Sequence, residues 1–160
     1  MSDRFSAVSG RNVVSRTTAE ELGSVTHVAV DVKRRQVASL VVGKGRKAAM
    51  IDYDQVSGFG PDAIMVADES ALHEPRDDHE REVAKGTFEL IGKRTLSDTG
   101  NDLGTVTDVV FDPDTGAIES ILIGGRPAPP GSLLGAGSFA VVVLEPAGSG
   151  ELADSRRDEP

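Results

Sequence analysis

The chain has 160 residues, a hydrophobic content of 38% and a formal net charge of −9 at pH 7. It contains no cysteine, which excludes disulfide bonds, thiolate nucleophiles and cysteine-ligated metals. The negative net charge argues against broad, non-specific binding of nucleic acids, because such binding requires cations that neutralise phosphates. Aromatic residues make up only 4% of the chain, so Val, Ile, Leu and Ala must fill the core.

The chain shows no targeting or membrane-spanning segment. Its first residues lack an apolar run of signal-peptide length, and no stretch approaches the ~20 apolar residues of a membrane span. The longest apolar runs, residues 37–43 and 140–144, have the length of strands. We therefore expect a cytoplasmic location and no direct insertion into a membrane.

The first predicted hairpin spans residues 22–43, with the sequence LGSVTHVAVDVKRRQVASLVVG. Side chains alternate between apolar and polar along residues 25–32, which is typical of a half-buried strand with Val28 and Val30 facing inward. An apolar run over residues 37–42 predicts the returning strand. The turn between these strands, VKRRQ, contains no glycine.

The remainder of the first repeat predicts three short strands, near residues 48–51, 55–59 and 63–67. A charge-dense segment follows over residues 72–86, with the sequence LHEPRDDHEREVAKG. This composition predicts a polar linker with one helical turn around residues 78–85.

The second predicted hairpin, LGTVTDVVFDPDTGAIESILIG over residues 103–124, repeats the first without a gap at an offset of 81. Its turn, DPDTG, has the Pro and Gly of a tight hairpin, and Val109 and Phe111 are predicted to face inward, opposite Asp108. The three prolines of RPAPPGSLL argue against a regular strand there, and a last strand is predicted at residues 140–144.

A second internal match supports a duplicated domain. The sequence VSGFGPDAIMVA from Val56 aligns with LLGAGSFAVVVL from Leu133 at an offset of 77, and a period near 80 residues suits a small domain. We predict an all-β fold of two tandem small antiparallel β-barrels joined by a charged linker. The predicted boundaries are 8–70 and 88–145 for the barrels, 71–87 for the polar linker and 146–160 for a disordered tail.

The second repeat resembles the PRC-barrel family, named for the cytoplasmic barrel of the photosynthetic reaction-centre H subunit. The resemblance lies in Gly92-Lys93, the turn SDTGND, the segment LGTVTD and the turn FDPDTG. The first repeat resembles the same pattern from Gly10-Arg11 onward, with His27 at the usual Asp and no turn glycine. Together the two resemblances cover residues 10–67 and 88–145.

The resemblance implies an adaptor module, because the residues that define the family shape turns and cores and none is catalytic. Family members are found fused to membrane anchors, in a ribosome-maturation factor, and as free-standing bacterial and archaeal proteins. This chain has no match to the separate amino-terminal domain of the maturation factor and no membrane helix, so it resembles the free-standing group most. No cofactor is implied.

The three histidines are His27, His73 and His79. The last two lie in the acidic linker, where a metal site and a solvated charged segment are alternative explanations. Because a zinc site needs three or four converging ligands, we predict no metal. His27 falls on the polar face of its strand and is expected at the surface. The sequence has no G-x-S-x-G motif and no arguable catalytic triad, so we predict no enzyme.

One group of cations stands out in this acidic chain, and we call it the basic island. No acidic residue lies between Asp31 and Asp52, and the equivalent turn of the second repeat is acidic, with Asp112 and Asp114. A solubilising hairpin end and a docking surface are alternative explanations. The island flanks a strand of about seven residues, so its halves lie ~20 Å apart unless the barrel bends them together. It consists of Lys33, Arg34, Arg35, Lys44, Arg46 and Lys47.

These observations predict a non-enzymatic protein-interaction or scaffolding module. Its partner is an unidentified protein, with an acidic surface if the basic island makes the contact. The alternative is a factor that associates with RNA or the ribosome through the same cations on the first barrel. A third interpretation, binding of a small molecule between the barrels, has no motif to support it.

Overall fold

A computed structural model describes residues 2–146 and contains two β-sheets of seven strands each. The first sheet is built from the first repeat and the predicted linker, in the order β6-β7-β2-β3-β4-β5-β8. Its strands are β2 (Asn12–Ser15), β3 (Glu21–Asp31), β4 (Gln36–Val42), β5 (Ala49–Asp52), β6 (Val56–Phe59), β7 (Ala63–Val66) and β8 (Leu72–His73).

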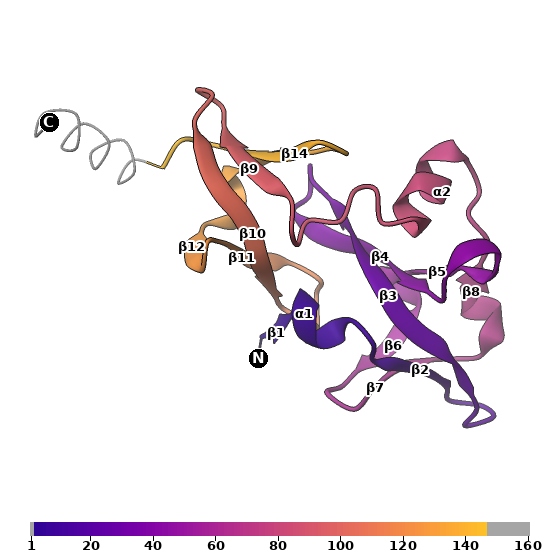
Figure 1. The fold of residues 1–160 in the computed structure, drawn as a ribbon. Coiled ribbons are helices and arrows are strands. Elements are labelled where there is room, and N and C mark those ends of the chain that lie inside the picture. The colour runs from indigo at the N-terminus through magenta and orange to yellow at the C-terminus, as the bar shows by residue number, and fades with distance from the viewer. Residues whose placement is uncertain (1, 147–160) are drawn as a thin grey trace, which may run out of the picture.

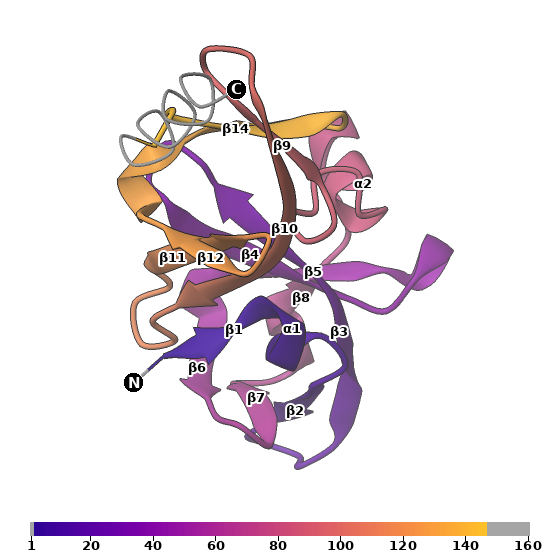
Figure 2. The same ribbon diagram turned by 60° about the vertical axis from the view of Figure 1, so that its left-hand side comes forward.

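The second sheet has the order β12-β11-β10-β9-β14-β13, and β1 pairs with β10 beside this path. Figure 1 and Figure 2 show the two sheets side by side, with the N-terminal segment close to both. The all-β fold class and the tandem arrangement are thereby confirmed. The strands are β1 (Asp3–Arg4), β9 (Arg94–Ser97), β10 (Asp102–Phe111), β11 (Ile118–Ile123), β12 (Arg126–Ala128), β13 (Leu133–Ala136) and β14 (Ala140–Val143).

Each sheet is mainly antiparallel but contains one parallel pair that the sequence did not indicate. Strand β2 runs parallel to β7, and β9 runs parallel to β14 at the equivalent place in the second repeat. The strands at the ends of each path do not pair with each other within residues 2–146, so neither barrel is fully closed. Each sheet is therefore open and has two terminal strands.

Bulges in the two long strands change which side chains face the core. Strand β3 shifts its register between Val25 and His27, so Val25 is buried together with Val28 although simple alternation places them on opposite faces. Strand β10 shifts equivalently between Val106 and Asp108. The inserted residue accounts for both departures from alternation.

The inward-facing positions were otherwise predicted correctly. Val28, Val109 and Phe111 are buried, and Val30 is partly buried against the same core. Asp108, predicted to face solvent opposite Val109, is instead only 8% exposed because of the bulge in β10.

The proline-rich segment contains more regular structure than predicted. Strand β12 includes Pro127 and pairs with β11 at the end of the second sheet, where the missing N–H removes no hydrogen bond from the sheet. A single 3-10 turn leads from there to β13, and an equivalent turn precedes β6 in the first repeat. The 3-10 turns are η1 (Gly45–Lys47), η2 (Tyr53–Gln55), η3 (Glu69–Ala71) and η4 (Pro130–Ser132).

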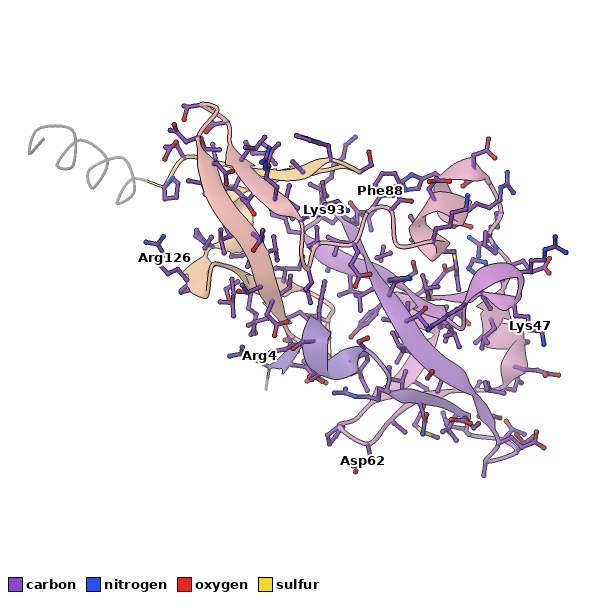
Figure 3. All side chains as sticks on the ribbon, viewed as in Figure 1. Arg4, Lys47, Asp62, Phe88, Lys93 and Arg126 are labelled. Atoms are coloured by element: carbon purple, nitrogen blue, oxygen red, sulfur yellow. The ribbon has the colours of Figure 1, made fainter. Side chains whose placement is uncertain are left out.

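The predicted linker is packed against the first sheet. Helix α2 (Asp78–Ala84) confirms the expected helical turn and is capped by Asp77, whose side chain accepts the Glu80 N–H. Strand β8 pairs with β5, and Phe88 lies between α2 and the second sheet (Figure 3). No helix within residues 2–146 has both the length and the apolar character needed to cross a membrane.

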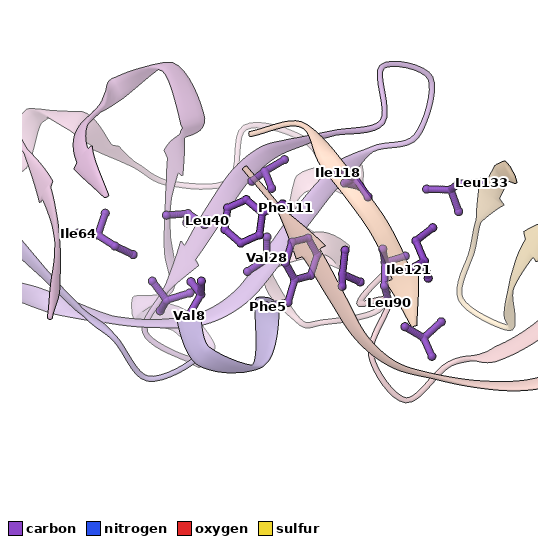
Figure 4. Packing of buried hydrophobic residues seen from close by; sticks show 14 of the residues in the cluster. Phe5, Val8, Val28, Leu40, Ile64, Leu90, Phe111, Ile118, Ile121 and Leu133 are labelled. Carbon is purple, nitrogen blue, oxygen red and sulfur yellow. The ribbon is translucent and has the colours of Figure 1, made fainter. Parts of the chain in front are cut away.

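The N-terminal segment, placed mostly outside the first predicted barrel, joins the two repeats. Strand β1 pairs with β10 of the second repeat, and helix α1 (Phe5–Val8) follows it and buries Phe5 and Val8. Phe111 lies edge-to-face against Phe5, with a centroid distance of 5.3 Å, and against Phe59 at 5.6 Å. Side chains of both repeats therefore form one continuous hydrophobic cluster (Figure 4). The predicted tail lies, beyond residue 146, outside the described residues.

Candidate interaction surface

The two repeats meet at the ends of their equivalent hairpins, β3–β4 and β10–β11. The Val37 N–H donates to the Gly116 carbonyl over 2.8 Å. Reciprocally, the Ile118 N–H donates to the Arg35 carbonyl over 2.9 Å. Because these residues are equivalent in pairs, the two hydrogen bonds are related by an approximate twofold axis, as in the interface of a symmetric dimer. One half of the basic island therefore lies at the contact between the repeats.

Arg35 joins the repeats with its side chain as well as its backbone. Its φ is +52°, in the left-handed region, where the second repeat has Gly116 with a φ of +81°. The Nη2 of Arg35 donates to the Leu133 carbonyl of β13 over 3.2 Å. Its Nε is buried and has no hydrogen-bond partner among the described residues. This side chain is thus directed at the second repeat.

Lys33 and Arg34 are exposed at the same hairpin end. The Nε of Arg34 lies 3.8 Å from Oδ2 of Asp31, and the Arg34 side chain is 78% exposed. An ion pair this exposed contributes little to stability. The seven residues of β4 separate these two cations from the rest of the island by ~20 Å, so the island is two surfaces.

Lys44, Arg46 and Lys47 form the second half, on the connection between β4 and β5. All three side chains are exposed, and none belongs to an ion pair formed within residues 2–146. The connection is shaped by Gly43 and Gly45, whose φ values of +79° and +62° favour glycine. Figure 3 shows Lys47 at the margin of the molecule, on the opposite side from the second repeat.

Helix α2 extends this cationic region with Arg81 and Lys85. A groove of about 480 Å³ lies between the helix and the β4–β5 connection, and its lining has three cations and one carboxylate. The helix is held there because its apolar residues pack on a small cluster from β4 and β5. We call the resulting region the basic surface. It consists of Lys44, Arg46, Lys47, Arg81 and Lys85.

The two helical cations are partly neutralised by acids of their own helix. Arg81 is paired with Asp78, and their hydrogen bond raises the pKa of Arg81 and lowers the pKa of Asp78. The Nζ of Lys85 lies 3.1 Å from Oε2 of Glu82, and this hydrogen bond is the main cause that lowers the pKa of Glu82. The cations of the β4–β5 connection therefore carry most of the uncompensated charge in this part of the structure.

Sequence reasoning did not assign Arg81 and Lys85 to the site. Their spacing of four residues, flanking Val83 and Ala84, is the pattern of a helix with one apolar and one cationic face. The sequence therefore contains this signal, but the acidic residues around it favour the interpretation as a solvated linker.

The three histidines occupy separate places. His27, expected at the surface, is partly buried against Glu89, because the glycine at position 86 leaves room for its ring. His73 bonds to Asp52, and His79 stacks on Phe88 at a centroid distance of 5.1 Å. No group of three or more His, Asp or Glu side chains in the described part of the chain is arranged to hold a metal ion.

Tyr53, which the sequence analysis did not single out, links the repeats beside the hairpin ends. Its hydroxyl donates to the Pro113 carbonyl over 2.6 Å, and its ring lies against Gly116, where a Cβ would be 3.0 Å away. Burial, followed by the charges of Asp112 and Asp114, raises the pKa of Tyr53 well above its ordinary value. A single tyrosine offers no sequence pattern from which this role follows.

Comparison with protein families matches the chain to the family described as the PRC-barrel domain, over residues 2–72 and 84–148. The first match includes the N-terminal segment that pairs with β10, and the two matches together contain every strand except the last residue of β8. The resemblance noted from the hairpin motifs is thereby confirmed. A comparison with curated proteins found no match.

Proposed function

The chain belongs to the PRC-barrel family, with two tandem copies of the domain, and from this premise we propose that it is a protein-interaction module. It acts as an adaptor that binds the acidic surface of a partner protein through the basic surface. The proposal includes no catalysis and no cofactor.

The observation that carries this proposal is the charge of the β4–β5 connection. Lys44, Arg46 and Lys47 lie within four residues and are exposed without an acidic partner in residues 2–146. Like charges this close repel one another, and an acidic protein has many carboxylates with which to neutralise them. An anionic partner relieves this repulsion, and charge complementarity of this kind accelerates association and selects partners.

The proposal retains three residues of the basic island and adds two. Arg35 is excluded because its side chain already bonds to the Leu133 carbonyl. Lys33 and Arg34 are excluded because β4 separates them from the other cations. Arg81 and Lys85 are added because the groove against the β4–β5 connection brings them together with Arg46.

The test is capture of partners from a lysate of the cells that produce the protein. Wild-type protein and the triple variant K44E/R46E/K47E are immobilised, and bound proteins are identified at about 50 mM and about 300 mM NaCl, with and without ribonuclease. We expect the wild type to retain one protein partner that the variant loses. Retention should weaken with salt, because the contact is electrostatic.

A matched control is the triple variant K33E/R34E/R126E, which changes the net charge equally at exposed positions outside the basic surface. It should retain the partner. Equal loss in both variants, or in neither, contradicts the assignment of the basic surface. Loss of the captured protein on ribonuclease treatment favours the alternative, in which the surface binds RNA.

A further inference from the structure

A second groove, of about 640 Å³, lies at the contact between the repeats. The ends of the β3–β4 and β10–β11 hairpins line it together with η2 and strand β6. Tyr53 and Phe59 both line the groove, with their ring centroids 5.9 Å apart. The groove thus combines two aromatic side chains with the edge of a sheet, and it shares no lining residue with the groove of the basic surface.

The charge of this groove is negative. Four carboxylates and one guanidinium, that of Arg34, line it. Asp31 is paired with Arg34, and Asp52 is hydrogen-bonded to His73 and Arg76.

The other two lining carboxylates are those of Asp54 and Asp114. Both residues are exposed, and neither takes part in an ion pair formed by the described residues. They come from different repeats, and both line the groove. A cation in the groove would therefore find one uncompensated carboxylate from each repeat.

Strand β6 supplies the second property of the groove. It is the terminal strand of the first sheet and pairs only with β7. A terminal strand presents N–H and C=O groups that an extended chain can use as a further strand. Charged or covered edges prevent such pairing in many proteins. Carboxylates beside an edge repel acidic chains and favour basic ones.

The internal duplication shows that the acidity does not come from the shared scaffold. At the offsets of 77 and 81, the equivalents of Asp52, Asp54 and Asp114 in the other repeat are Pro129, Gly131 and Lys33. The twofold-related place therefore lacks these three carboxylates and carries a cation.

At the twofold-related place, an arginine side chain contacts the start of the terminal strand. There the guanidinium of Arg35 donates to the carbonyl of Leu133, the first residue of β13. The equivalent residue on the acidic side is Val56, the first residue of β6. The position equivalent to Arg35 is Gly116, which has no side chain to reach across.

We propose that the acidic groove binds an extended, basic segment of a partner protein. The segment adds to β6 as a further strand, and one of its Arg or Lys side chains lies between Asp54 and Asp114, as Arg35 lies against β13. This site is separate from the basic surface and does not depend on the function proposed for it.

The test uses fluorescent peptides and the full chain. The probe is an acetylated, amidated peptide of four Arg-Thr repeats, and its binding is measured by fluorescence anisotropy at about 50 mM NaCl. We expect the double variant D54N/D114N to bind it about tenfold more weakly than the wild type, because two carboxylates lose their charge. The control variant E21Q/E69Q removes two exposed carboxylates elsewhere and should bind like the wild type.

Two further peptides separate strand addition from simple charge attraction. A peptide of Glu-Thr repeats should not bind. An Arg-Thr peptide methylated on every backbone nitrogen should bind at least about tenfold more weakly, because neither of its edges can donate hydrogen bonds to an edge strand. Spermidine, added at the same total positive charge as the Arg-Thr peptide, should compete only weakly with that peptide for the groove.

Several results would overturn the proposal. The first is that the Arg-Thr peptide does not bind. The second is that D54N/D114N and E21Q/E69Q weaken its binding equally, and the third is that the methylated peptide binds as tightly as the unmethylated one. Equal competition by spermidine would show a site for free amines. If D54N/D114N has a lower melting temperature than the wild type, the single variant D54N is used in its place, because Asp54 is exposed. D54N should weaken binding by about half as much as the double variant on a logarithmic scale.

Discussion

At the scale of single residues, the duplication allows the backbone strain of a residue in one repeat to be judged against its equivalent in the other. Ala19 has a φ of +61°, and its equivalent in the second repeat, Gly100, has a φ of +92°. The same replacement occurs at Arg35 and Gly116. Positive φ is unfavourable for residues with a Cβ, so the first repeat holds two strained turns that the second repeat has relieved with glycine.

Ala19→Gly should stabilise the protein. It relieves about 1–2 kcal/mol of left-handed strain, while the added freedom of the unfolded chain costs about 0.4–1 kcal/mol, leaving a gain of about 0.5–1 kcal/mol. Urea denaturation with an unchanged m-value measures this gain. The reciprocal variant Gly100→Ala should lose a similar amount, since no atom lies within 4 Å of a Cβ placed there. A loss of stability in Ala19→Gly contradicts the strain argument.

Tyr53 provides a second prediction at this scale, on pH dependence. Its raised pKa means that the folded protein retains the phenolic proton more tightly than the unfolded chain. The stability of the wild type should therefore be complete below the ordinary tyrosine pKa of 10.0 and decrease as the pH rises above it. Tyr53→Phe should lose about 1–2 kcal/mol at neutral pH, because the Pro113 carbonyl loses its donor, and should lack this alkaline decrease. Denaturation at two pH values compares the variants.

At the scale of elements, the sequence predicts the hairpins but not their register. The alternation in β3 and β10 and the turn residues are local signals, so both hairpins and the inward Val28 and Phe111 follow from them. The bulges depend on how many residues the partner strand offers, which is not a local property. The parallel pairs join segments about fifty residues apart, and no short pattern encodes them.

The N-terminal segment is the element whose role was hardest to predict. Strand β1 has only two residues, and Phe5 belongs to no periodic pattern, yet its ring completes the edge-to-face contact with Phe111. Ser6 adds a hydrogen bond from its N–H to Asp108 over 3.1 Å. A segment of the first repeat thus covers the core of the second.

Phe5→Ala should therefore destabilise the whole protein, by about 3–5 kcal/mol, as expected for a buried phenylalanine. Thermal denaturation followed by circular dichroism measures the loss. The control is Ser9→Ala, an exposed position at the end of the same segment, which should change stability by less than about 0.5 kcal/mol. Similar stability of Phe5→Ala and Ser9→Ala would mean that the segment does not hold the repeats together.

At the scale of the whole molecule, duplication has produced a twofold scaffold with different charges on its two halves. The cations of the basic island are close in sequence, but they lie at the two opposite ends of β4. At one of these ends, α2 adds Arg81 and Lys85 from the predicted linker. Proximity along the chain therefore indicated three of the five residues of the candidate site. The other two depend on where the linker packs, and the charged composition of the linker gives no indication of this packing.

The continuous core predicts that both repeats unfold together. Tyr53 is the only tyrosine, the chain has no tryptophan, and its fluorescence therefore reports on the first repeat at the contact with the second. Ile121 is fully buried in the second repeat, and Ile121→Val should remove about 0.5–1.5 kcal/mol. Because the cluster includes both repeats, the urea midpoint measured by tyrosine fluorescence should fall as much as the midpoint measured by far-ultraviolet circular dichroism. If the fluorescence midpoint stays at the wild-type value while the dichroism midpoint falls, the repeats unfold independently, and the reciprocal hydrogen bonds at the hairpin ends are too weak to couple them.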